Sequence, residues 1–206
     1  MKKLAALLLA AAMAFTCVAC GGNAGNAGNS GNSGNGGSTE IKDATEILTK
    51  AWEEYNNKVS EDYKFPVGGG NIENFELIVS DNAGKCDLTL EGAKDAVSVS
   101  YCIPLENLEM VDDCGNMMNM MMANNFSAAA YHVTDCENVE KVVAGIKEAT
   151  MNNMWMCGMP DTLIIVTIGD YVVSAFGNGE VIEYFKTAIT TVYANATVAV
   201  EENLAQ

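Results

Sequence analysis

The stretch that decides the fold is TLIIVTIGDYVVSAF, residues 162–176. Two runs rich in β-branched and aromatic residues, 162–168 and 171–176, flank the dipeptide Gly169–Asp170. Two β-rich runs separated by two turn residues are typical of a tight β-hairpin. The sequence therefore predicts an antiparallel pair of strands here, ended by the Gly-Asn-Gly at 177–179.

The segments on either side of the hairpin extend this pattern. FSAAAYHV, residues 126–133, predicts a strand, and Thr134 with Glu137 fits the capping pattern that begins a helix. The predicted order from residue 126 is β-α-β-β-α, because apolar residues recur at helical spacing before and after the hairpin. These residues are Val139, Val142, Val143 and Ile146, and later Val181, Ile182, Phe185, Ile189 and Val192.

The first part of the domain is less regular. Helical spacing predicts a helix over residues 41–57, and the runs FELIVS (75–80) and AVSVSYCI (96–103) predict strands. Residues 110–122 again place apolar side chains at helical spacing. Since helices bury their apolar stripes against a sheet, we expect an α+β, two-layer domain in which helices cover a mostly antiparallel sheet.

The methionine-rich stretch CGNMMNMMM, residues 114–122, has three interpretations. One is an adaptable apolar contact surface, which with residues 151–159 would form a Met-lined groove for an apolar ligand or peptide. On a helix, its cysteine and all its methionines except Met120 fall within an arc of about 140°, with polar residues opposite. A surface helix packs such an arc on a core, and methionine fills irregular gaps there. The third is a soft-metal site, because thioethers and a thiolate suit Cu(I). Its ligands would be Cys114, Met117, Met118 and Met121, with a second Met-rich segment at 151–159.

The N-terminus has the composition of an export signal. Two lysines follow Met1, the run Leu4–Phe15 is apolar, and small residues precede Cys20. The apolar run has 12 residues, which is too short to span a bilayer because a span takes about 20. The sequence therefore predicts a signal peptide over residues 1–19.

Residues 17–20, CVAC, resemble the lipobox of bacterial prolipoproteins, in which small residues precede an obligatory cysteine. The resemblance implies that Cys20 becomes the acylated N-terminus. Fatty acids such as palmitate would then hold the protein on the extracytoplasmic face of the cell membrane. Cys17 departs from the pattern, since an aliphatic residue is usual at that place.

Residues 20–38 continue from this cysteine as a tether of Gly, Asn, Ala and Ser, which we expect to be disordered because it has nothing to bury. A single domain is expected over residues 39–206. Over residues 100–190, the strings MMMANNFSAAAYHV, WMCGMP and GDYVVSAFG are similar to an uncharacterised domain of lipoproteins from Gram-positive anaerobes. That family implies a sheet-and-helix domain on a lipid tether and brings no established activity.

The charge of the chain excludes one class of partner. After signal cleavage, nine lysines and no arginine oppose 27 acidic residues, which gives a net charge of −18. Such a surface repels phosphate backbones, and the arginine contacts that read bases are missing. We therefore expect no nucleic-acid partner.

The cysteines and the single histidine give no catalytic signature. Five cysteines lie in the predicted domain at spacings of 16, 12, 22 and 21 residues, without the paired spacing of zinc sites: Cys86, Cys102, Cys114, Cys136 and Cys157. The sequence leaves any disulfide pairing among them open. His132 lies in a predicted strand, where a structural role is commoner than nucleophilic catalysis with a cysteine.

These observations favour a lipid-anchored, non-catalytic module that binds a protein or small-molecule partner outside the cytoplasmic membrane. Cu(I) binding through the two Met-rich segments, 117–122 and 151–159, is the alternative. A Cys-His enzyme is the least favoured hypothesis, and no cofactor is expected.

Overall fold

An antiparallel sheet of five strands organises the part of the chain that the computed structural model describes, which is residues 41–62, 86–119, 125–155 and 159–204. The strand order is β1-β2-β4-β3-β5, and every neighbouring pair is antiparallel. The strands are β1 (Val111–Asn119), β2 (Phe126–Val133), β3 (Thr162–Ile168), β4 (Tyr171–Gly177) and β5 (Thr197–Asn203). All described residues belong to one compact unit, Asn35–Gln206.

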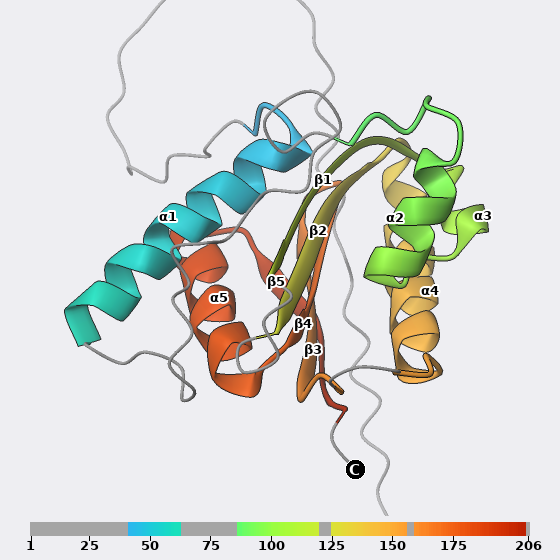
Figure 1. Cartoon of the computed structure of the whole chain (residues 1–206). Coiled ribbons are helices and arrows are strands. Elements are labelled where there is room, and N and C mark those ends of the chain that lie inside the picture. The colour runs from blue at the N-terminus through green and yellow to red at the C-terminus, as the bar shows by residue number, and fades with distance from the viewer. Residues whose placement is uncertain (1–40, 63–85, 120–124, 156–158, 205–206) are drawn as a thin grey trace, which may run out of the picture. The chain divides into compact units, whose positions relative to one another are not determined.

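Helices cover both faces of this sheet (Figure 1). On one face lie α1 (Ala44–Asp62) and α5 (Gly179–Val192); on the other lie α2 (Ala93–Tyr101), α3 (Leu105–Leu108) and α4 (Val139–Met151). The connections explain this arrangement, because α4 leads from β2 past β4 to β3, whereas α5 leads from β4 past β3 to β5. Both crossovers move toward β5 across the sheet, but they start from β2 and β4, which are antiparallel to each other. The right-handed preference of such connections therefore requires opposite faces.

Each face of the sheet has its own core. Alternate residues of the three central strands point to the α1/α5 face, among them Ala128, Ala130, Ile164, Val166, Val173 and Ala175. Their neighbours point to the α2/α4 face, among them Ala129, Tyr131, Leu163, Ile165, Val172 and Phe176. A strand has a side-chain period of two, so a sheet buried on both faces gives continuous apolar runs. This is the reason why β3 and β4 are so apolar in the sequence.

The expected α+β class, the antiparallel sheet covered by helices and the C-terminal β-α-β-β-α order are confirmed. The structure adds a second helical layer to the two-layer arrangement that the sequence predicts, and it adds β5. The predicted capping pair is wrong. Asp135 forms the cap, accepting a hydrogen bond from the Glu137 backbone N–H at 3.0 Å at the start of the 3-10 turn Cys136–Asn138, which leads into α4.

Two predicted elements are wrong. Residues 110–122 were expected to contain a helix, but Val111–Asn119 form strand β1. Residues 96–103 were expected to form a strand, but most of them belong to α2, in which Val97 and Tyr101 lie four residues apart on the buried face and Val99 is 80% exposed. Residues 75–80, the other predicted strand, lie outside the described residues, as do the predicted signal peptide and tether.

Candidate functional site

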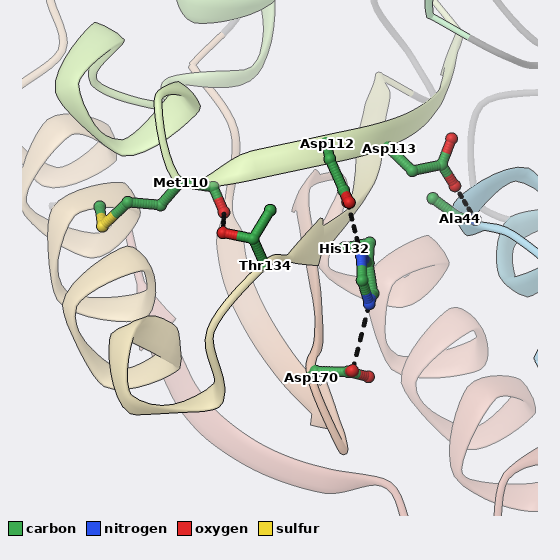
Figure 2. Close-up of polar contacts among 7 residues, drawn as sticks. All are labelled: Ala44, Met110, Asp112, Asp113, His132, Thr134 and Asp170. Carbon is green, nitrogen blue, oxygen red and sulfur yellow. Dashed lines mark hydrogen bonds and ion pairs between the residues drawn. The ribbon is translucent and has the colours of Figure 1, made fainter. Parts of the chain in front are cut away.

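A bulge at the start of β1 places a carboxylate beside the ring of His132. Val111 pairs with Val133 and Asp113 pairs with His132, so Asp112 is an extra residue in the strand. A bulge of this kind disrupts the ladder and redirects a side chain. The Asp112 carboxylate consequently reaches the His132 ring, with Oδ1 2.5 Å from Nδ1 (Figure 2).

The tight turn between β3 and β4 supplies the second carboxylate. Gly169 has φ 63°, a conformation that suits glycine at the first central position of a hairpin turn. Asp170 follows it, and its Oδ2 lies 3.1 Å from Nε2 of His132. The histidine ring therefore stands between two carboxylates, which come from β1 and from the β3–β4 turn (Figure 2).

This geometry favours the protonated form of the ring. An ionised carboxylate only accepts hydrogen bonds, so two such partners favour the imidazolium, in which both ring nitrogens of His132 donate. Partial burial favours the neutral ring, but the hydrogen bonds and charges of Asp112 and Asp170 outweigh it and raise the pKa of His132 above its usual value. In its protonated form, with both nitrogens donating, the ring has no lone pair to act as a general base or to bind a metal. Its chemical role in this arrangement is an ionic clamp between β1, β2 and the hairpin turn.

The next residue of β1 fixes helix α1. Oδ2 of Asp113 accepts a hydrogen bond from the Ala44 backbone N–H at 2.7 Å, and Oδ1 of Asp43 accepts one from Glu46 at 2.8 Å. Carboxylates at a helix N-terminus satisfy its free N–H groups and stabilise its dipole. Gly115 permits the close approach, since a Cβ there would lie 2.8 Å from the Thr45 backbone.

The predicted soft-metal ligands do not share one face. Cys114 is fully buried among the residues that pack under α2 and α4, and Met118 is partly buried against the same cluster. Met117 is 1% exposed and packs on the opposite face, beneath α1 and α5. The convergence on which the metal hypothesis depended came from a helical face that does not exist, and Met121 lies outside the described residues. Within the described ranges, no group of three or more His, Cys, Asp and Glu side chains is placed to hold a metal ion.

A shallow groove lies on the α2/α4 side of the sheet. Its volume is about 260 Å³, and its lining includes Val99 of α2, Cys102 and Asn153. Two of the most exposed apolar side chains of the described residues line or adjoin it, because Val99 is 80% exposed and Met154, next to Asn153, is 89% exposed. Part of the second Met-rich segment is therefore at the surface, while Trp155 packs against Phe176 with ring centroids 5.1 Å apart.

The sequence did not indicate Asp112 and Asp170 as partners of His132. The predictions for these segments used only neighbouring residues. The contacts of His132 depend instead on the bulge and on the strand register, because Asp112 is 20 positions and Asp170 is 38 positions away in the chain. Cys20, the predicted lipidation site, lies outside the described residues. In the described segments, no helix has the length and apolarity needed to cross a membrane.

Comparisons of the chain with protein families, with curated proteins and with solved structures found no match. The functional argument therefore depends on the residues themselves.

Proposed function

We propose that this protein is a lipoprotein, anchored through Cys20 to the extracytoplasmic face of the cell membrane, whose α+β domain is a non-catalytic interaction module. The N-terminal sequence supports the anchor, because a short apolar signal directly precedes a lipobox-like CVAC and a Gly/Asn/Ser tether. Two or more acyl chains on one cysteine give stable attachment without a membrane-spanning helix.

The state of the single histidine supports a non-catalytic role. His132 is the chain's only histidine and the residue best suited to act as a base near neutral pH. Both of its nitrogens are held by carboxylates, at 2.5 and 3.1 Å. The ring therefore stabilises the fold instead of activating a nucleophile.

Exposed apolar side chains on the α2/α4 side of the sheet support the interaction role. Val99, in the lining of the groove, is 80% exposed, and Met154, which follows the lining residue Asn153 in the chain, is 89% exposed, although the same face of the sheet buries a well-formed core. Exposed apolar side chains gathered beside a concave surface are typical of contact sites, and methionine adapts to partners of different shape. We assign this groove, lined in part by Val99 and Asn153, as the contact surface of the module, with Met154 following Asn153 in the chain.

Replacement of the predicted lipidation site tests the anchor. Cys20→Ala should abolish incorporation of labelled palmitate and move the protein from the membrane fraction to the soluble fraction. Cys17→Ala is the matched control, because it changes the other cysteine of CVAC and should leave both measurements unchanged. Palmitate labelling that persists in Cys20→Ala would refute the assignment.

Site-specific photocrosslinking on the anchored full chain tests the contact surface. A photoreactive residue at Met154 should form one defined adduct on intact cells, and the same residue at exposed Ala194, beyond α5, should not. Val99→Asp should reduce the Met154 adduct at least several-fold without changing the melting temperature, because Val99 is 80% exposed. Equal adducts from both positions, insensitive to Val99→Asp, would rule out a contact surface at the groove.

A further inference from the structure

Two cysteines meet at the outer edge of β1. The backbone N–H of Cys86 donates to the carbonyl oxygen of Cys114 at 2.7 Å, on the strand's far side from β2. Their side chains also lie in the same place, because Cys86 packs against the core cluster that contains Cys114. The Cys114 thiol itself donates to the Gly115 carbonyl oxygen at 3.8 Å. A direct backbone hydrogen bond keeps the two residues side by side, and disulfides span Cα separations of about 4.4–6.8 Å. Both residues are free thiols in this structure.

The two thiols differ in a way that suits ordered oxidation. Cys86 is half-buried, whereas Cys114 is fully buried. The neighbouring Cys114 thiol lowers the pKa of Cys86, and the Cys86 thiol together with burial raises the pKa of Cys114 well above its usual value. The accessible sulfur is thus the one with more thiolate character, which is the property of an attacking cysteine.

We propose that Cys86 and Cys114 are a redox-active pair that closes to a disulfide by exchange with a disulfide-bearing oxidant, either a small-molecule disulfide or an oxidase of the compartment. The Cys86 thiolate attacks one sulfur of the oxidant, forms a mixed disulfide and expels the first thiolate. The Cys114 thiol then loses its proton and attacks the Cys86 sulfur, which expels the second thiolate. The protein loses two electrons and two protons, and the oxidant is reduced to two thiols.

The other described cysteines do not compete for this role. Cys102 is the buried C-cap residue of α2. Asn153 donates a hydrogen bond to its sulfur at 3.5 Å, and burial raises the pKa of Cys102 to about 11. Cys136 is exposed in the 3-10 turn before α4. The sequence left every pairing open, and Cys157, the fifth cysteine, lies outside the described residues.

Fragment mapping of the full chain tests the pair directly. The purified protein is reduced, equilibrated with oxidised glutathione, alkylated and cleaved with trypsin and cyanogen bromide. Cleavage after Lys85, Lys94, Met110 and Met117 isolates Cys86–Lys94 and Val111–Met117, each with a single cysteine. We expect these two fragments linked, with the mass of two hydrogens lost. Recovery of both fragments alkylated and unlinked, or linkage of Cys86–Lys94 to any other fragment, overturns the proposal.

Thermal unfolding provides the second measurement. Closing the loop from Cys86 to Cys114 restricts the unfolded chain, so oxidation should raise the melting temperature by about 10 °C. Cys86→Ala should remove this rise, and exposed Cys136→Ala is the matched control that should keep it. An equal rise in Cys86→Ala overturns the proposal. Neither measurement involves membrane attachment, so failure of the Cys20 anchor leaves the result interpretable.

Discussion

Strand β1 and the β3–β4 hairpin belong to one sheet but depend on different contacts. β3 and β4 are central strands, paired on both edges and buried on both faces. β1 is an edge strand. Its polar side chains attach it to its surroundings, Asp112 to His132 and Asp113 to the start of α1, and its backbone accepts a hydrogen bond from Cys86. The hairpin is therefore specified by local sequence, whereas β1 is specified by partners as far as 69 positions away.

The largest expected effect tests the apolar side of this comparison. Ile165→Ala in β3 removes a fully buried side chain from the core on the α2/α4 face and leaves a cavity there. We expect it to lower the free energy of unfolding by about 4 kcal/mol, measured by urea denaturation at pH 7. Met117→Ala in β1 should cost less, about 2–3 kcal/mol, because an edge strand can close partly over the cavity. Equal losses would show that β1 is as rigidly packed as the central strands.

This difference also explains which elements the sequence predicted. The hairpin, β2 and the helices α4 and α5 have patterns that only one structure satisfies, such as two β-rich runs around Gly169–Asp170. In β1, Cys114 and Met118 are four residues apart, a spacing that fits one face of a helix and equally one face of a strand. Pairing with β2 decides between the two, and no local pattern reports that pairing.

Strand β5 escaped prediction for a related reason. The register shifts between Ile165 and Val166, so Val200 and Val198 pair with successive residues of β3. The two valines consequently pack on opposite faces of the sheet, although they are two positions apart. An edge strand with such a bulge does not show the simple alternation that identifies a half-buried strand.

The site was less predictable than the fold. His132 was assigned a structural role from its strand, and the clamp agrees with that role, but its carboxylate partners come from a bulge and a turn. The interpretation of the methionine stretch as packing agrees with the burial of Met117 and Cys114, although the helix on which that interpretation was built is a strand. Packing depends on the apolar character of these side chains, which is the same in a helix and in a strand. The metal site depended on a shared helical face, which the strand does not provide.

A matched pair of glycine substitutions sharpens the comparison at intermediate cost. Gly115→Ala in β1 places a Cβ 2.8 Å from the Thr45 backbone, which should push α1 outward and cost about 2–3 kcal/mol of unfolding free energy. Gly169→Ala in the hairpin turn meets no atom within 4 Å, but at φ 63° an alanine is strained by about 1–2 kcal/mol.

A second substitution separates the two causes. Thr45→Ala should not rescue Gly115→Ala, since the obstructing atoms include the backbone N and Cα of Thr45. Full rescue in urea denaturation would instead identify the Thr45 hydroxyl as the whole obstacle. α1 would then be free to sit closer to β1 than Asp113 and Ala44 place it.

The smallest expected effect is the pH dependence of the ionic clamp that joins the two regions. Because the pKa of His132 is raised in the folded state, its stabilisation is fully present below pH 6.5, the ordinary histidine value, and is lost as the pH rises through the folded pKa. Tyr171, whose ring centroid lies 4.8 Å from that of His132, has a pKa of about 12 and stays neutral in this range. The pKa of Cys86 is lowered, which gives a contribution of opposite sign toward higher pH.

The contribution of the clamp is therefore measured as the difference in free energy of unfolding between Cys86→Ala and the double variant Cys86→Ala/His132→Gln. Urea denaturation gives this difference at each pH from 5.5 to 8.5. We expect this difference to fall with rising pH by about 1 kcal/mol or less, since the clamp is partly exposed and screened by solvent. Asp112→Asn and Asp170→Asn should each reduce the slope, and added salt should weaken it. If Asp112→Asn alone removed the slope, the ion pair between Asp112 and His132 would account for the whole pH dependence. Asp170 in the hairpin turn would then orient the ring without adding to that dependence. A difference that rises with pH would mean that the ring is neutral in the folded protein, and the clamp would then be an ordinary hydrogen bond.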